Sequence, residues 1–335
     1  MVGDVTTLEI DIGIDGIPLA ESALEAWPIS ARCNNLCDKK PFCIGLFCGY
    51  GKPEVDEFLK DYICDVKDLL EHGIKREGKH FFVCIKRYIC DAPGRSFVKR
   101  IKGHTGYSSC ERCVQEGDYQ DNRMRFDSFK SAPRTEESFI NQTDAEHHIG
   151  ISPLTCLPTK FLQMFVLEPM HLLYHGVHKR FIHFLTSKCK TQARLSAHQI
   201  CKISEKLANL HEFKPCEFVR MPRAIECVGR WKATELRMFG LYLSIVVMKG
   251  IVAEEVYKLI LILFVACRIV SCPEHVKQSE MVEYAEALFS TFVVHSCDKS
   301  VFGKKLSHII FTVCSMFAKM LEHTMKILTS FQLFP

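Results

Sequence analysis

The sequence lacks a hydrophobic run long enough to cross a bilayer, and its first residues lack the basic segment of a secretory signal peptide. The most apolar stretch, residues 259–270, is interrupted by Arg268 and is too short for a membrane span. Residues 1–15 contain acids but no lysine or arginine. We therefore expect no membrane partner, and a reducing compartment in which disulfides do not form.

Neither charge sign dominates, and neither internal repeats nor low-complexity tracts are present. A net charge of +4 permits a nucleic-acid partner without requiring one. The chain has 335 residues, of which 47% are hydrophobic and 24% charged, so it can form two domains or one large domain with an insertion. Its 18 cysteines are scattered through apolar segments, where a free thiol packs as a small hydrophobe.

The first part of the chain combines several strand patterns with one helix pattern. Residues 54–72 carry apolar side chains at helical spacing, with acids in the first turn and Gly73 as a C-terminal cap. The order of these elements predicts an α/β fold, and it matches a mixed sheet core of the RNase-H-like type. Strands are predicted over residues 5–15, within 17–32, over 41–48 and over 81–89.

The second part of the chain changes character. Residues 118–157 are polar and rich in acids, which predicts a linker. We therefore divide the chain into an RNase-H-like core with a CxxC motif at 1–117, a polar linker at 118–157, and a large, mostly helical insertion block at 158–335. Its helices are predicted over residues 161–185, 197–210, 234–247, 254–270 and 279–294.

Two aspartates stand where predicted strands end. Asp15 follows the first strand, and Asp91 follows the strand at 81–89. If these strands are neighbours in one sheet, the two carboxylates can hold Mg²⁺ or Mn²⁺ against a phosphodiester. The alternative is that each aspartate only caps a turn by bonding its own backbone. Asp11 is a weaker candidate for the first position, because an Asp-Gly pair favours Asp15.

Cys110 and Cys113 form a CxxC motif, a spacing that can supply two of the four ligands of a zinc ion. Candidates for the remaining ligands are His104, His171 and His308, none of which stands at a diagnostic spacing. The alternative is a pair of packed thiols without metal.

Basic side chains follow Asp91 at helical spacing. They are candidates for binding the DNA phosphates that flank a scissile bond. The alternative is an ordinary solvated helix face. These candidate nucleic-acid-binding residues are Arg95, Lys99, Arg100 and Lys102.

A series of short motifs carries a resemblance to a known enzyme family. They are Ile14-Asp15-Gly16-Ile17-Pro18-Leu19, Trp27-Pro28-Ile29, Ile44-Gly45-Leu46-Phe47-Cys48-Gly49, Ile89-Cys90-Asp91-Ala92-Pro93-Gly94-Arg95, Lys102-Gly103-His104-Thr105-Gly106-Tyr107 with Cys110 and Cys113, and Trp231-Lys232-Ala233-Thr234-Glu235-Leu236-Arg237. In this order they resemble the transposases of animal CACTA (EnSpm-like) DNA transposons, over roughly residues 8–295.

The resemblance implies a DDE-type enzyme with an RNase-H-like core. In that family two aspartates and one glutamate hold two divalent ions, and a CxxC with a histidine pair binds zinc. Asp15 and Asp91 correspond to the two aspartates, and Cys110 and Cys113 to the two cysteines. The partner that the resemblance implies is the DNA of transposon ends, together with a second copy of the chain in a homodimer, and the implied location is the nucleus.

The end of the sequence departs from the family pattern. The family carries Asn-Val-His-x-x-x-His and then Phe-Glu-Asn with the third carboxylate, but here Phe311 and Ser315 stand where the histidines belong. The chain ends at Pro335, about where the glutamate is expected. We therefore expect a truncated copy whose third carboxylate is missing. Glu235 is the remaining motif-borne candidate, with a first-turn helix acid as its alternative.

These observations predict a transposase-derived protein for DNA strand cleavage and transfer with two divalent metals (Mg²⁺ or Mn²⁺), and with zinc as a second cofactor. The first alternative is a catalytically dead transposon remnant that binds DNA or protein. The second is a metal-dependent RNase-H-like nuclease without a joining step. Both the transposase and the nuclease require a third carboxylate.

Overall fold

The computed structural model describes residues 5–19, 23–120, 123–126, 131–186 and 193–296. The chain divides into two compact units, which are treated separately below. Unit 1 contains residues 1–124 and 131–168, and unit 2 contains 125–130 and 169–335. Within the described residues, the fold is α/β, with a mixed sheet of seven strands in unit 1.

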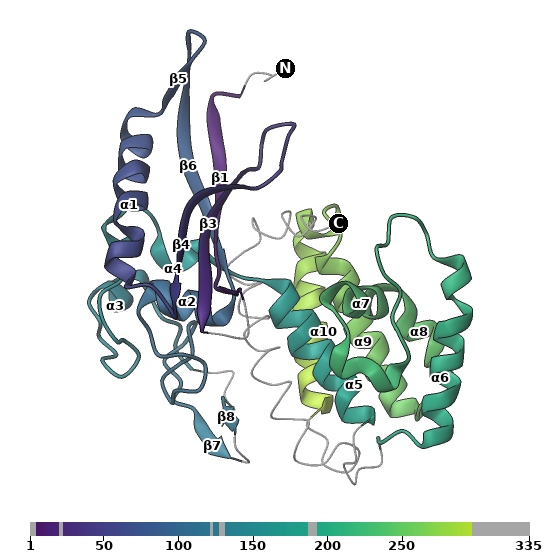
Figure 1. Cartoon of the computed structure of the whole chain (residues 1–335). Helices are drawn as coiled ribbons and strands as arrows, with labels where there is room; N and C mark the ends of the chain where they lie inside the picture. The colour runs from purple at the N-terminus through teal and green to yellow at the C-terminus, as the bar shows by residue number, and fades with distance from the viewer. Residues whose placement is uncertain (1–4, 20–22, 121–122, 127–130, 187–192, 297–335) are drawn as a thin grey trace. The chain divides into compact units, whose positions relative to one another are not determined.

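The sheet of unit 1 has the order β2-β3-β1-β6-β5, with β4 on β3 and β9 on β6 (Figure 1). β1 pairs antiparallel with β3 and parallel with β6, and β9 also pairs parallel with β6. The sequence-based prediction of an α/β fold is thereby confirmed. The strands are β1 (Thr7–Ile14), β2 (Ile17–Pro18), β3 (Leu24–Cys33), β4 (Phe42–Tyr50), β5 (Ile74–Arg76), β6 (Lys79–Cys90) and β9 (Phe165–Leu167); β7 (Asp118–Gln120) and β8 (Arg123–Arg125) form a separate pair.

One irregularity in β6 alters its alternation. The register between β1 and β6 changes from Ile10 opposite Ile85 to Asp11 opposite Arg87, so Lys86 is an extra residue, a β-bulge. Before the bulge the buried residues of β6 have odd numbers, and after it they have even numbers. The bulge therefore determines which side chains of the last four residues of β6, from Arg87 to Cys90, point into the core.

Two helices pack in unit 1 close to the sheet. α1 (Val55–His72) begins at Glu54, whose carboxylate accepts hydrogen bonds from the first backbone N–H groups, and ends at Gly73, where φ is +64°. That left-handed conformation is one that glycine adopts without a Cβ clash. α2 (Ala92–Lys99) follows β6 directly and begins with a proline in its first turn. The apolar face of α1 enters the core of unit 1.

The segment predicted as a polar linker contributes to the core of unit 1. It contains α3 (Glu136–Ile140) and η1 (Pro153–Cys156). Phe139, Leu154 and Leu157 are buried in the same cluster as the side chains of the sheet. Glu137 and Glu146 of this segment are exposed, whereas a few large apolar residues attach it to the sheet.

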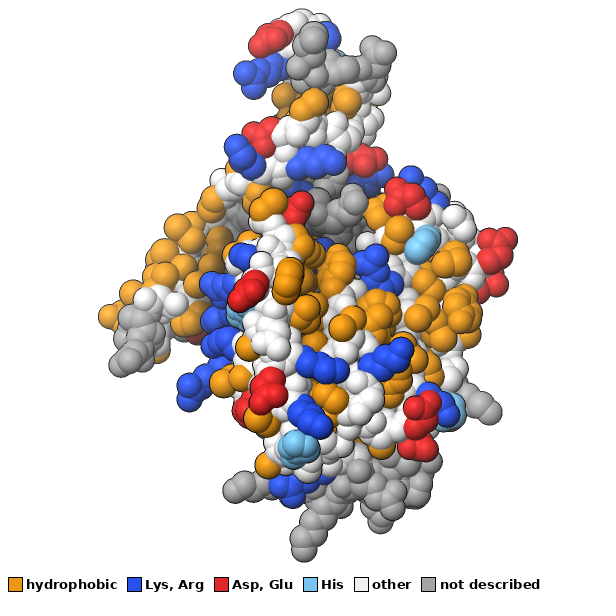
Figure 2. All heavy atoms as spheres, turned by 90° about the vertical axis from the view of Figure 1, so that its right-hand side faces the viewer, with side chains coloured by type: hydrophobic (Ala, Val, Ile, Leu, Met, Phe, Trp, Pro, Cys, Tyr) orange, Lys and Arg blue, Asp and Glu red, His pale blue; other side chains and the backbone are white. Residues whose placement is uncertain are grey.

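Unit 2 is helical in its described residues. On the face shown in Figure 2, hydrophobic side chains lie among lysine, arginine and acidic ones. No described helix has the length and apolar character that crossing a membrane requires. Its elements are η2 (Met170–His178), α5 (Lys179–Thr186), α6 (Ala197–Asn209), η3 (His211–Phe213), η4 (Ile225–Arg230), α7 (Ala233–Met238), η5 (Phe239–Leu243), α8 (Ser244–Val247), α9 (Glu254–Val270), η6 (His275–Lys277) and α10 (Ser279–Ser296).

The helix predicted over residues 161–185 is interrupted. The chain forms α4 (Phe161–Met164), then β9, and becomes helical again only from Met170. Pro169 explains the break, because a proline cannot donate to the preceding turn and disfavours a helical residue before it. η2 and η5 are π-helical, a rare geometry that sequence periodicity does not distinguish from an α-helix.

Candidate metal and nucleic-acid site

Asp15 and Asp91 lie at the same end of two neighbouring parallel strands. β1 and β6 pair up to Gly13 opposite Ile89. Continuing that register by two residues brings Asp15 level with Asp91. Because the carboxyl ends of parallel strands share one edge of a sheet, both carboxylates belong to this edge, beside the start of α2 (Figure 1). We call it the carboxylate edge.

Local hydrogen bonds orient both side chains. Asp91 Oδ1 accepts a hydrogen bond from the backbone N–H of Gly94 at 2.6 Å, so Asp91 is the N-cap of α2. Asp15 Oδ1 accepts one from the N–H of Gly16 at 2.9 Å. A Cβ on Gly94 would lie 3.0 Å from Asp91 Oδ1 and 3.1 Å from the carbonyl oxygen of Ile14. The missing side chain therefore lets α2 begin directly against the end of β1.

The charges of Asp15 and Asp91 both act on the thiol of Cys90. Cys90 is buried, and its pKa is raised to about 12, first by burial and further by the negative charges of Asp15 and Asp91. The guanidinium of Arg95 opposes this effect. Burial is therefore the main cause of this raised pKa, and Arg95 acts on Cys90 more strongly than either aspartate does.

Asp11 is buried and forms ion pairs inside unit 1. It is 2% exposed and lies between two arginines of neighbouring strands, with Oδ1 2.8 Å from Arg87 Nε and Oδ2 3.5 Å from Arg32. Both of its oxygens are therefore engaged inside unit 1. Of the two candidates for the first position, Asp15 is the one at the strand end.

Two of the candidate phosphate-binding residues are buried. The carboxylate of Glu111 accepts hydrogen bonds from Arg95 Nε at 2.9 Å and from Lys99 Nζ at 3.0 Å. Burial raises the pKa of Glu111, but the charges of Arg95 and Lys99 outweigh it and hold that pKa well below its usual range. Lys99, 1% exposed, also lies over the rings of Phe139 and Phe165. These two cations neutralise an internal carboxylate of unit 1.

The other two candidates are nearer the surface and also have acidic partners. Arg100 ends α2 in a left-handed conformation, and its guanidinium lies 2.9 Å from Asp56 at the start of α1. Lys102 Nζ lies 2.6 Å from Glu146. The structure does not gather the four basic residues on one exposed face, because α2 turns two of them inward.

The CxxC motif forms a contact between thiols. The Sγ atoms of Cys110 and Cys113 are 3.3 Å apart, and both residues are buried. The hydrogen bond with Cys113, followed by burial, raises the pKa of Cys110, which favours the thiol over the thiolate that zinc requires. Among the described residues, no group of three or more histidine, cysteine, aspartate or glutamate side chains is arranged to hold a metal. The motif thus supplies half of a zinc ligand set.

The histidines proposed to complete that set lie elsewhere or outside the described residues. His104 is exposed, His171 is part of η2 in unit 2, and His308 falls in the segment 297–335 that the structure does not describe. Phe311, Ser315 and the expected position of the third carboxylate fall in the same segment.

A buried histidine that was not among these candidates lies in unit 1. His147 Nδ1 donates to the carbonyl oxygen of Ser108 at 2.6 Å, and its Nε2 is buried with no hydrogen-bond partner among the described residues. Burial lowers the pKa of His147 to about 4, so the ring is neutral at pH 7. The adjacent pair His147-His148 was the available sequence signal, but its spacing matched no ligand pattern.

Glu235 belongs to unit 2, and its carboxylate accepts four hydrogen bonds. Its carboxylate receives the backbone N–H of Lys232 at 2.7 Å, the backbone N–H of Arg223 at 3.3 Å, and Arg223 Nε and Nη2 at 2.8 and 2.9 Å. Burial opposes ionisation, but the bonds from Arg223 and Lys232 lower the pKa of Glu235. This geometry is that of a first-turn helix acid, which was the alternative interpretation of Glu235, whereas its partner Arg223 was not predicted.

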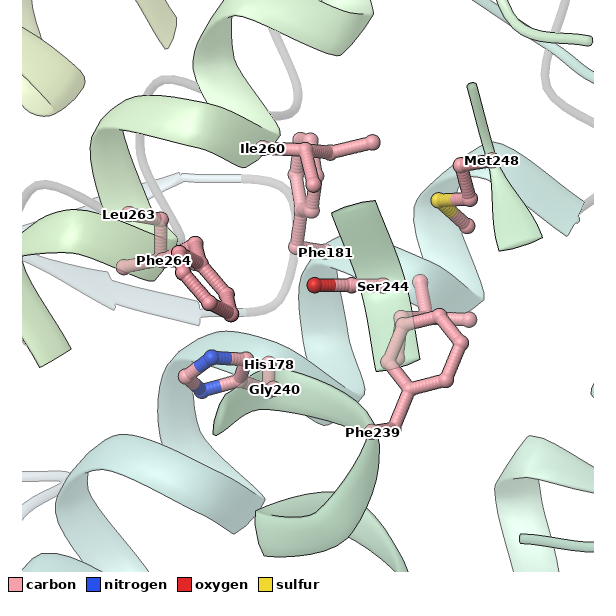
Figure 3. Close-up of a pocket in the computed structure, with 10 residues that line it drawn as sticks. His178, Phe181, Phe239, Gly240, Ser244, Met248, Ile260, Leu263 and Phe264 are labelled. Atoms are coloured by element: carbon pink, nitrogen blue, oxygen red, sulfur yellow. The ribbon is translucent and has the colours of Figure 1, made fainter. Parts of the chain in front are cut away.

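A small cavity lies between helices of unit 2 (Figure 3). Its volume is about 20 Å³, enough for one water molecule. His178 is buried at its wall, next to Gly240, where a Cβ would lie 2.4 Å from His178 Nε2. The remaining lining is mostly apolar, including Phe181, Phe239 and Leu263. The cavity is too small for an organic ligand, so we assign it to packing.

No protein-family model matches this chain, and no curated protein is similar enough to count as a relative.

Proposed function

We propose that unit 1 is the RNase-H-like core of a transposase-derived, DDE-type protein that cleaves and transfers DNA strands with divalent metal ions. The feature that supports this proposal is that Asp15 and Asp91 each follow an adjacent parallel strand, β1 and β6, whose last pair is Gly13 with Ile89. The motif resemblance to CACTA transposases supports it, because the same two aspartates lie within the matching motifs. In this proposal, unit 2 is the helical insertion block.

The donor chemistry of the carboxylate edge fits Mg²⁺ or Mn²⁺. Mg²⁺ is commonly bound by one or two carboxylates, with waters and substrate phosphates completing its shell. Asp15 and Asp91 would hold the ions, which supply a Lewis acid and an activated oxygen nucleophile when bound. The hydrogen bonds from Gly16 and Gly94 orient the two carboxylates, and the ion pairs of Arg95 and Lys99 with Glu111 hold α2 in place.

A second candidate is a DNA-binding remnant without catalysis. It is favoured by the engagement of Glu235 with Arg223 in unit 2, and by the lack of a third ligand beside Asp15 and Asp91 among the described residues. Zinc remains part of the proposal only through Cys110 and Cys113, and no step depends on it.

Isothermal titration of Mn²⁺ tests the metal site. Asp91→Ser removes the carboxylate but keeps an oxygen that can cap α2, and Asp15→Asn keeps an acceptor for Gly16 N–H. We expect both changes to abolish Mn²⁺ binding, while Asp61→Asn on the exposed face of α1 leaves it unchanged. Equal Mn²⁺ binding by all four proteins would reject the site.

Nicking of supercoiled DNA then separates the two candidates. A DDE core nicks the plasmid only with Mg²⁺ or Mn²⁺, and both site variants reduce the rate to background. A protein that binds DNA and Mn²⁺ but never nicks supports the remnant instead.

A further inference from the structure

Lys52 differs from the cations already described because it has no acidic partner. It is exposed in the loop between β4 and α1, and no described residue forms an ion pair with it. Its ammonium instead lies over two aromatic rings, 5.7 Å from the centroid of Trp27 and 5.9 Å from that of Phe97. Such contacts hold a cation in place without neutralising its charge.

The two rings connect Lys52 to the carboxylate edge. Trp27 contacts the residue after Asp15, since a Cβ on Gly16 would lie 2.6 Å from the indole atom Cζ2. Phe97 belongs to α2, the helix that Asp91 caps, and its ring centroid is 4.8 Å from that of Trp27. Trp27 and Phe97 therefore form an aromatic pair that lies next to Gly16 and under Lys52.

The surrounding strands place Lys52 at the same end of the sheet. Leu24 at the start of β3 pairs with Tyr50 at the end of β4, and β2, which follows Asp15, pairs with the same part of β3. The N–H of Gly51 bonds the carbonyl oxygen of Ala23 at 2.8 Å, which ties the loop to that end. Gly51 has a φ of +73°, a conformation that costs other residues energy.

We propose that Lys52 is a phosphate-binding residue of the carboxylate edge, and that it holds a phosphate of duplex DNA beside the one that lies against Asp15 and Asp91. An ammonium on a flexible stem binds phosphate as a point charge. Trp27 is 2% exposed, so its ring supports the lysine and does not stack on a base. This inference rests on the proposed function, because it takes DNA as the substrate.

The test measures DNA binding in EDTA, where the metal ions play no part. Fluorescence anisotropy of a labelled duplex is followed as KCl is raised, for the full chain and for Lys52→Gln. Loss of one phosphate contact lowers the slope of log K against log salt by about 0.9. Lys52→Arg keeps the charge and should retain the slope of the original protein.

Lys67→Gln is the matched control, because Lys67 is exposed on α1 toward its opposite end. We expect it to leave the slope unchanged. Equal slopes for Lys52→Gln and Lys67→Gln overturn the inference, and so does an original protein that does not bind the duplex. Failure of the proposed metal site appears separately, as absent Mn²⁺ binding with the Lys52 effect intact.

Discussion

The two units bury ionisable side chains in different ways. In unit 1, Glu111 lies inside the fold between Arg95 and Lys99, so a buried acid has two buried cations around it. In unit 2, Glu235 pairs with a surface arginine, and the buried His178 is neutral among apolar neighbours. Directional charge pairs fix positions, whereas apolar packing mainly fills volume. Unit 1, which carries the carboxylate edge, therefore positions α2 through a buried charge cluster in addition to its apolar core.

The chain offers one tryptophan in each unit for testing this contrast. Trp27 is buried in unit 1 and Trp231 in unit 2, and the sequence contains two tryptophans. Replacing either one by phenylalanine leaves a fluorescence signal that reports the unfolding of a single unit. Each of the three variants below is made in the single-tryptophan protein whose remaining tryptophan lies in the same unit as the substitution.

Glu111→Gln should have the largest effect on stability. It leaves Arg95 and Lys99 buried without a counter-charge, so the free energy of unfolding of unit 1 should fall by about 3–5 kcal/mol. Because the pKa of Glu111 is lowered in the folded state, its contribution is present above its ordinary value of 4.5 and is lost as pH falls. Urea unfolding followed by Trp27 measures both the loss and its pH dependence.

Glu137→Gln is the control for that variant, since Glu137 is exposed on α3. It should change the unfolding free energy by less than about 0.5 kcal/mol. Equal losses from the two changes would show that the buried charge cluster does not determine the stability of unit 1.

His178 should make the stability of unit 2 depend on pH. Burial lowers its pKa to about 4, so between the ordinary value of 6.5 and pH 4 the unfolded chain binds a proton that the folded unit does not. Stability is therefore full above pH 6.5 and falls as pH drops, by up to about 3 kcal/mol. Urea unfolding followed by Trp231 should show a shallower pH slope in His178→Gln, but not in His183→Gln, which changes an exposed histidine.

Glu235→Gln should have the smallest effect of the three. The change weakens charge-assisted bonds from Arg223 and Lys232 at the start of α7, and we expect a loss of about 1–2 kcal/mol. If Glu235 has only this structural role, the Mn²⁺ affinity of the full chain stays unchanged. Lost Mn²⁺ binding with retained folding would instead identify Glu235 as a metal ligand.

Most strands and helices could be predicted from the sequence, because their signals are local. The helix at 54–72 had an acidic first turn and Gly73, and the structure places α1 and its cap there. The sequence also indicated strand ends at Asp15 and Asp91, and the structure ends β1 at Ile14 and β6 at Cys90. The bulge at Lys86 was missed because residues 81–85 and 88–90 are apolar at every position, so the sequence does not show which of them point inward.

The environment of α2 could not be predicted from periodicity. Arg95 and Lys99 are four residues apart, which places them on one helix face but does not say whether that face meets solvent or protein. The deciding residue, Glu111, lies in a later loop and contacts them only in the folded chain. Lys52 was missed for a related reason, since its aromatic partners come from β3 and α2.

The extra residue in β6 makes this strand sensitive to length as well as to composition. Substituting Lys86 would leave the spacing of the chain intact, and deleting it would give a regular ladder in which Ile85 and Arg87 still pair with Ile10 and Asp11. Tyr88 and Cys90 would keep their inward positions, and Asp91 would keep its place after the last pair of β1 and β6. An insertion or deletion between Arg87 and Cys90 would instead turn the side chains after it to the opposite face, so β6 accommodates a change of length at its bulge better than beyond it.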